Sequence, residues 1–157
     1  MSFEILLEKE PFEHFGTQAL RGLIRLGEEE ESFFAPISFW GRQEYLNSWY
    51  SSLCLGLERR QHSVLVTSML DPESANFLMV WVLYFVGESV HIQNSVVFLD
   101  DVVPGFNVDD VNTYVGVREV VNEDGDRISE WVVPLSEVLG FKEKLKMEVE
   151  SSKTKSD

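Results

Sequence analysis

Three strand-like runs follow one another closely in the sequence, and they limit the possible folds more than any other feature. His62–Met69, Phe77–Val86 and Ser89–Leu99 are rich in valine, leucine and aromatic residues, a composition typical of strands. Asp71-Pro72 and Gly87-Glu88 supply turn residues between them. Because such short connections join antiparallel neighbours, the sequence predicts an antiparallel sheet.

Further strands are expected on both sides of these runs. Downstream, Tyr114–Val121 and Arg127–Val133 flank an Asp-Gly turn and predict a hairpin. Upstream, three segments have strand-like patterns: Phe3–Glu8, Leu20–Leu26 and Phe33–Phe39. Leu20–Leu26 also fits a helix, and Pro36 favours an edge position for its strand. The acidic run Glu28–Glu31 is expected to form a turn.

Two helices complete the prediction. Residues 42–59 place Tyr45, Trp49, Leu53 and Leu57 four apart, which gives one broad apolar face. A second helix is expected over residues 136–149, followed by a flexible polar tail at 151–157. The sequence therefore predicts one α+β domain over residues 1–150, with a mainly antiparallel sheet, a central helix and a C-terminal helix.

The chain is strongly acidic, with 27 aspartate and glutamate residues, 13 lysine and arginine residues and a formal net charge of −14. Such a charge repels nucleic acid and anionic membranes, and it accelerates encounter with a basic partner. The single cysteine, Cys54, is typical of the reducing cytosol. The N-terminus lacks signal-peptide features, and Phe77–Val86 is far shorter than the ~20 residues of a membrane helix. We therefore expect a cytoplasmic protein.

The sequence contains no recognisable catalytic or metal-binding motif. His14, His62 and His91 stand far apart and match no metal-ligand spacing. Cys54 lies on the apolar face of the expected helix, where free cysteine usually acts as a small hydrophobic residue. Residues 122–126 have the spacing of a calcium loop but lack its glycine and final glutamate. We predict no catalytic residue, no metal and no cofactor.

Some polar residues within the expected strands have two interpretations. Arg118 lies among apolar valines, and Glu130 on the other arm of the hairpin is its expected partner in a structural ion pair. Aromatic and amide residues also mix on adjacent strands: Trp81, Tyr84, Gln93 and Asn94. These four fit a core with a polar seam or a recognition patch, because aromatic residues are enriched at interface centres.

Short motifs spread over residues 20–142 resemble those of a known family. In chain order they are Leu26-Gly27, Glu31-Ser32-Phe33, Trp40 followed by Tyr45 and Trp49, Leu65-Val66-Thr67-Ser68, Trp81-Val82-Leu83-Tyr84, Gln93-Asn94, Tyr114, Arg118 and Ile128-Ser129-Glu130-Trp131. The chain resembles the immunity proteins of bacterial contact-dependent growth inhibition systems, the group that protects against nuclease-type CdiA toxin tips. The Ser-Glu-Trp and Gln-Asn pairs are the most distinctive parts.

The resemblance implies a cytoplasmic protein that is not an enzyme. It implies that the chain binds and blocks the C-terminal toxin domain of its cognate CdiA, a basic nuclease domain, because some toxins countered by this family are similar to RNases that cleave tRNA. The shared residues look mainly like scaffold residues, and structural roles are expected for Trp49, Trp81, Arg118, Glu130 and Trp131. Toxin contacts vary between pairs, so the resemblance transfers no contact residue.

The acidic residues suggest where a basic toxin could bind. A nuclease needs a cationic groove for RNA phosphates, and an acidic inhibitor can occupy that groove and exclude the substrate. The candidate contact residues lie in four expected loops, where binding residues often occur: Glu28, Glu29, Glu30, Glu31, Asp100, Asp101, Asp109, Asp110, Glu123, Asp124 and Asp126. Ordinary solubility explains them equally well, and the paired aspartates could bind a divalent ion, although such pairs are more often solvated.

Two other classes of function remain open. A small hydrolase would use carboxylates such as Glu130 or Asp101, and it would need a deep pocket that raises their pKa. An acidic adaptor or chaperone would bind many partners rather than one.

Overall fold

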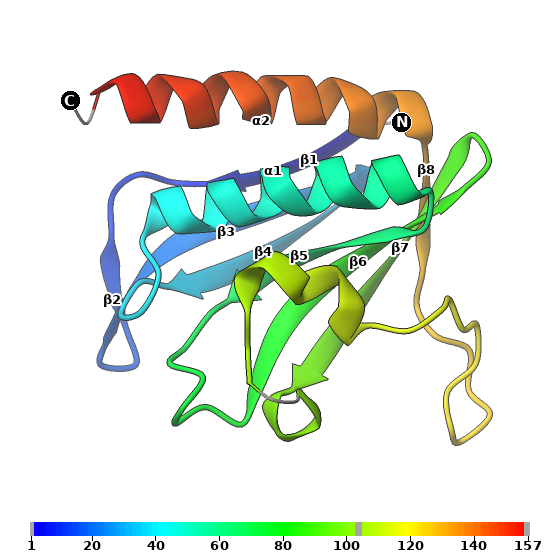
Figure 1. Cartoon of the computed structure of the whole chain (residues 1–157), viewed down its shortest axis with the longest axis horizontal. Coiled ribbons are helices and arrows are strands. Elements are labelled where there is room, and N and C mark those ends of the chain that lie inside the picture. Colours follow the sequence, from blue (N-terminus) through cyan, green and yellow to red (C-terminus); the bar gives the residue numbers. More distant parts are fainter. Residues whose placement is uncertain (1, 103–104, 156–157) are drawn as a thin grey trace.

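The computed structural model describes residues 2–102 and 105–155, in which the chain forms two antiparallel sheets and two long helices (Figure 1). Sheet A contains β1 (Ser2–Leu7), β2 (Phe12–His14), β3 (Thr17–Gly27) and β4 (Glu29–Pro36). Sheet B contains β5 (His62–Ser68), β6 (Phe77–Val86), β7 (Ser89–Phe98) and β8 (Trp131–Pro134). The helices are α1 (Arg42–Arg59) and α2 (Leu135–Lys155), and the short 3₁₀ helices η1 (Leu99–Asp101) and η2 (Val108–Tyr114) follow β7.

Strand β3 is the centre of sheet A. It pairs with β4 along one edge, while β1 and β2 share the other edge, opposite residues 22–27 and 17–19. Gly22 faces Phe33 across the β3–β4 pair, and a Cβ atom on Gly22 would lie 2.3 Å from the ring. The aromatic ring therefore packs directly on the glycine backbone, which explains a glycine in the middle of this strand.

Helix α1 joins the two sheets and packs against β5. Its apolar face places Trp49 in the core, where the indole N–H donates to the Val66 carbonyl oxygen at 2.8 Å. The Tyr45 hydroxyl donates to the Pro36 carbonyl oxygen at 2.6 Å and accepts from the Met69 N–H at 2.9 Å. These buried bonds attach the helix to β4, to β5 and to the segment that follows β5.

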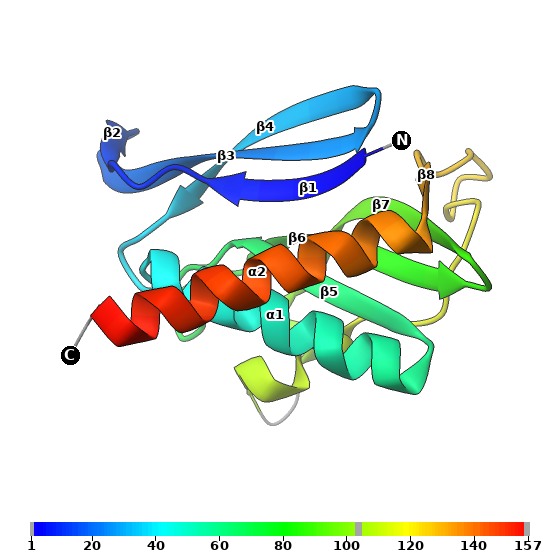
Figure 2. The same ribbon diagram turned by 90° about the horizontal axis from the view of Figure 1, so that it is seen from above.

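Helix α2 lies between β1 and α1 (Figure 2). Phe3 of β1 meets Phe141 of α2 edge to face, with 5.4 Å between the ring centroids. The Arg42 guanidinium, at the start of α1, donates to the Leu7 carbonyl oxygen at 3.1 and 3.2 Å and pairs with Glu148 of α2. The first strand and the last helix therefore close one core together.

The predicted fold class is confirmed, and so are the longest predicted elements. The central helix has the predicted ends, and β5, β6 and β7 match the three strand-like runs to within one residue. The strands divide between two sheets because α1 separates β4 from β5, and the short strand β2 is absent from the prediction. No helix among the described residues is long and apolar enough to span a bilayer.

The predicted hairpin is confirmed only at its turn, where Val121 forms an antiparallel bridge with Arg127 and the Asn122 N–H donates to the Asp126 carbonyl oxygen at 2.8 Å. Its arms are largely wrong. Tyr114–Val121 is not a strand, and Arg127–Val133 becomes extended only at its end, where β8 begins. Residues 115–130 form an irregular segment, named loop 115–130 below. β8 pairs with β7 instead, and there Trp131 packs against Trp81 with 5.6 Å between ring centroids. Burial of this indole against sheet B therefore prevails over the local hairpin pairing.

The prediction of an acidic turn over Glu28–Glu31 is wrong beyond Glu28, because Glu29 already begins β4. Cross-strand pairing supports this extension, since Arg25 of β3 lies opposite Glu30 with 3.0 Å between charged atoms. An acidic run on an edge strand also discourages pairing with other chains.

Helix α2 also differs from its predicted bounds. It begins at Leu135 rather than Ser136, and it ends at Lys155 rather than near Val149. Residues 151–155 contain neither glycine nor proline, so nothing in their sequence stops the helix. Residues 156–157 of the predicted tail lie outside the described residues.

Candidate functional site

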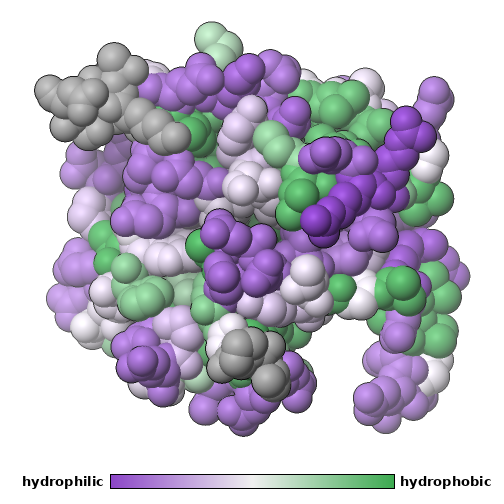
Figure 3. All heavy atoms as spheres, in the orientation of Figure 1, coloured by the Kyte–Doolittle hydropathy of each residue, from purple (hydrophilic) through white to green (hydrophobic). Residues whose placement is uncertain are grey.

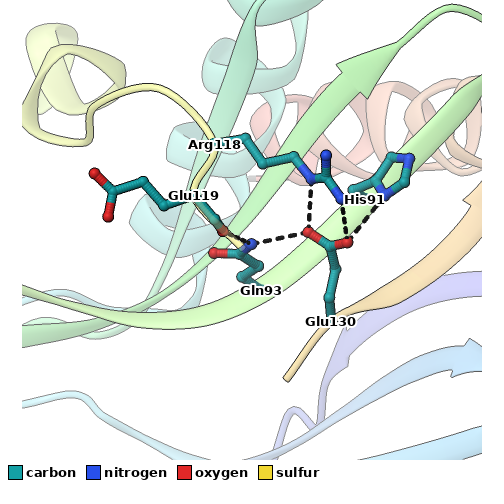
Figure 4. Close-up of polar contacts among 5 residues, drawn as sticks. All are labelled: His91, Gln93, Arg118, Glu119 and Glu130. Carbon is teal, nitrogen blue, oxygen red and sulfur yellow. Dashed lines mark hydrogen bonds and ion pairs between the residues drawn. The ribbon is translucent and has the colours of Figure 1, made fainter. Parts of the chain in front are cut away.

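A network of polar side chains at the base of loop 115–130 centres on the Glu130 carboxylate (Figure 4). Arg118 binds it with two hydrogen bonds, Nε to Oε2 at 2.8 Å and Nη2 to Oε1 at 2.6 Å. Two residues of β7 also donate to it, His91 Nδ1 at 3.0 Å and Gln93 Nε2 at 2.8 Å. Gln93 Nε2 reaches the Glu119 carbonyl oxygen as well, at 2.8 Å. The network therefore fastens loop 115–130 to sheet B, and the predicted Arg118–Glu130 ion pair is confirmed.

The environment of Glu130 strongly favours its charged form. The Arg118 guanidinium is the main cause, and with the bonds from Gln93 and His91 it lowers the carboxyl pKa to about 2 despite burial of the group. The same ion pair raises the pKa of Arg118. A carboxylic acid that donates a proton at neutral pH needs a raised pKa, so the shift has the wrong direction for Glu130 as a general acid.

The predicted acidic contact residues occupy several separate places. Glu28 lies in the turn before β4 and Glu29–Glu31 lie in β4, Asp100 and Asp101 lie in η1, Asp109 and Asp110 lie in η2, and Glu123, Asp124 and Asp126 lie in loop 115–130. All are exposed except the half-buried Glu31. Figures 1 and 2 show η2 beside α1, whereas loop 115–130 extends away from α1. The structure therefore does not gather the four loops into one patch.

The four glutamates at the start of β4 differ in their surroundings. The carboxylate of Glu29 accepts a hydrogen bond from the indole N–H of Trp131, which links sheet A to β8. Glu30 pairs with Arg25, and Glu31 faces a groove between the sheets. Among the described residues, Glu29 and Glu30 therefore have polar partners that Glu28 and Glu31 lack.

Loop 115–130 projects from the body of the protein, with a hydrophilic tip (Figure 3). Asn122 orders the tip, because its Oδ1 atom accepts from the backbone N–H groups of Asp124 and Asp126, each at 3.0 Å. These bonds account for the spacing that resembles a calcium loop. Among residues 2–102 and 105–155, no three histidine, cysteine or acidic side chains are placed to hold a metal ion.

An aromatic cluster lies at the opposite end of sheet A, and no motif of the sequence predicts it. The rings of Phe12, His14, Phe15 and Phe34 follow one another at the β2–β3 hairpin. Behind them, a groove of about 480 Å³ separates β4 from sheet B, and we name it the inter-sheet groove. The available sequence signal is a phenylalanine directly before the turn glycine Gly16.

The expected scaffold tryptophans and the mixed aromatic and amide residues are also placed by the structure. Trp49 and Trp81 are buried, and Trp131 is half-buried. Trp81 and Asn94 are register partners that line the inter-sheet groove, whereas Gln93 points to the Glu130 network. Trp81 and Asn94 therefore lie on one face of sheet B and Gln93 lies on the other, and the recognition patch stays a prediction.

Comparison with known proteins identifies the family. The model of the CdiI N-terminal domain matches residues 35–141, about two thirds of the chain. The chain belongs to this family. The matched range contains α1, the Glu130 network and loop 115–130, but it leaves out β1, β2 and β3.

Comparison with CdiI proteins extends the match to almost the whole chain. The immunity protein CdiI of Enterobacter cloacae is 39% identical over 139 residues, which are 88% of this chain and 95% of the relative. A chain in the solved CdiA-CT/CdiI toxin and immunity complex from Enterobacter cloacae is 38% identical, with a TM-score of 0.87. That match covers 92% of this chain and 98% of the other. The predicted resemblance to immunity proteins of contact-dependent growth inhibition is confirmed.

Proposed function

We propose that this protein binds the C-terminal toxin domain of its cognate CdiA and blocks it, and that the toxin is a basic nuclease acting on RNA. The match to a chain of the CdiA-CT/CdiI complex carries the proposal, because it extends over 92% of this chain at 38% identity. The function is inhibition rather than catalysis, and neither nucleic acid nor a membrane is a partner. The site of action is the cytoplasm.

The charge of the chain supports a nuclease as the target. A net charge of −14 disfavours RNA binding by this protein but favours capture of a cationic RNA-binding surface. Electrostatic attraction mainly raises the association rate, while close contacts set the dissociation rate. The acidic residues at the tip of loop 115–130 are suited to this role, because the loop projects and the Glu130 network fixes its base.

The test uses the toxin domain of the CdiA protein encoded with this chain. Co-expression should restore growth, and the purified proteins should form a complex that stops RNA cleavage. The triple variant Glu123→Lys, Asp124→Lys, Asp126→Lys should associate at least about tenfold more slowly at low salt, and its association rate should depend less on salt.

A matched control makes the same change of charge elsewhere. Glu58, Glu73 and Glu88 are exposed and lie outside the candidate loops, so their replacement by lysine should slow association much less. Equal slowing in both triple variants would show that only net charge matters. Absence of both rescue and complex formation by the wild-type protein would refute the proposed function.

A further inference from the structure

A phenylalanine stands almost fully exposed at the tip of the β2–β3 hairpin. Phe15 has 95% of its surface exposed, and its φ of 50° lies in the left-handed region. Gly16 follows with a φ of 79°. Two-residue hairpin loops with two positive φ angles favour asparagine, aspartate and glycine, and a bulky side chain is rare there. Neither burial nor turn preference therefore explains phenylalanine at this position.

One ring contact connects Phe15 to an aromatic cluster. The His14 ring lies 4.5 Å from the Phe15 ring and 4.1 Å from the Phe34 ring, measured between centroids. Phe34 in turn meets Phe12 at 5.5 Å, and the Arg21 guanidinium lies 4.2 Å above the Phe12 ring. Ring contacts that already exist in the free protein reduce the entropy lost when a partner binds.

The inter-sheet groove begins at this aromatic cluster. Phe15 and Phe34 line it from sheet A, and Leu70, Met79 and Trp81 line it from the side of sheet B. Its volume of about 480 Å³ falls within the usual range for pockets that bind small groups. Phe15, Phe34 and Leu70 all remain more than a third exposed, so the chain itself does not cover this apolar surface.

One carboxylate faces the groove. Glu31 is the only acidic residue among the described residues that line it, and no described residue forms an ion pair or hydrogen bond with its side chain. The groove is also lined by uncharged polar side chains, among them Thr67, Ser68 and Asn94. Its apolar surface beside one unpaired carboxylate is complementary to an apolar side chain next to a basic one. A second copy of this chain, with its charge of −14, would instead bring like charges together.

We propose that the inter-sheet groove receives a segment of the cognate toxin domain in which an apolar side chain lies next to a lysine or arginine. The apolar side chain packs against the exposed Phe15, Phe34 and Leu70, and the cationic group pairs with Glu31. This inference rests on the proposed function and adds to it a second contact region, apart from loop 115–130. Aromatic side chains, phenylalanine among them, are enriched at the centres of protein interfaces.

The decisive variant is Phe15→Asn. Asparagine tolerates positive φ, so the variant should melt at or above the temperature of the wild-type protein. Its dissociation constant for the purified toxin domain should nevertheless rise at least about tenfold. A purely structural role of Phe15 would move stability and leave affinity unchanged. Glu31→Gln should also weaken binding and reduce its salt dependence.

The control is Met147→Ala on α2, because Met147 is 71% exposed and lies far along the chain from the groove. Its affinity should equal that of the wild-type protein. If Phe15→Asn binds the toxin domain within twofold of the wild-type protein, the groove is not a toxin contact and the inference is overturned. The inference is also overturned if the wild-type protein self-associates and Phe15→Asn abolishes this self-association without weakening toxin binding.

These outcomes separate the inference from the proposed function. If the wild-type protein neither binds nor inhibits the toxin domain, the proposed function fails and the inference fails with it. If the wild-type protein inhibits and the Phe15 variant inhibits equally well, only the inference fails.

Discussion

Replacement of Glu130 by glutamine should destabilise the protein strongly, because the carboxylate is the centre of the network beneath loop 115–130. Glutamine keeps the shape of the side chain but removes the charge that Arg118 neutralises through two hydrogen bonds. The Glu130 side chain is only 14% exposed, so water replaces little of the lost interaction. The arginine is left partly buried without its counter-ion.

The magnitude follows from the pKa of the carboxyl group. Its pKa falls from the usual 4.5 to about 2 on folding, and 1.36 kcal/mol per pH unit converts this difference to roughly 3 kcal/mol at neutral pH. For a domain of this size, such a loss should lower the melting temperature by roughly 6–12 °C. Between pH 4.5 and 2 the unfolded state binds the additional proton, so the stabilisation is complete above pH 4.5 and disappears as the pH approaches 2.

The assay is thermal unfolding followed by circular dichroism at pH 7, 5, 4 and 3. The difference between wild-type protein and Glu130→Gln should stay constant from pH 7 to pH 5 and then shrink, because the wild-type protein loses its advantage. Glu88→Gln, at an exposed position in the β6–β7 turn, should change stability by less than about 0.5 kcal/mol. A difference below about 2 °C at pH 7, or one that is the same at pH 3, would refute the reasoning.

Two further predictions concern packing around α1. Gly56→Ala should lower the free energy of unfolding in urea by about 1–3 kcal/mol, because the added Cβ would lie 2.0 Å from Ser63 Oγ. As the control, Gly140→Ala has open space around it, so it should be neutral or stabilise α2 by up to about 1 kcal/mol. Asn112→Ala should cost about 2–3 kcal/mol in the same assay, because Asn112 Oδ1 accepts from the Val64 N–H at 2.7 Å on the edge of sheet B, and an unchanged midpoint would contradict this role.

The elements predicted well from sequence are those whose own side chains carry a complete pattern. The four-residue spacing of α1 and the long apolar runs of β6 and β7 are local signals, and they survive because their burial agrees with them. Tyr114–Val121 carries a similar number of valines, but no neighbouring strand pairs with it, and Val117 is 83% exposed. Its conformation depends on the bonds that His91 and Gln93 of sheet B donate to loop 115–130, and a local pattern does not contain them.

The candidate site was predictable in part for the same reason. The acidic residues are visible in the sequence, and the Arg118–Glu130 pair follows from their positions around one turn. The hydrogen bond from Trp131 to Glu29 joins residues 102 positions apart, so only the fold reveals that Glu29 is already engaged. Phe15 is recognised as unusual only when its backbone angle and exposure are known, and the sequence shows neither.

The contact between β1 and α2 delays the closing of the core until the end of synthesis. Phe3 is among the first residues to leave the ribosome, yet its partner Phe141 is made close to the end of synthesis. Phe3 therefore has no ring partner until nearly the entire chain has been translated. A chain that stops before α2 lacks Phe141 and the other apolar side chains of this helix, so its core stays open on that side.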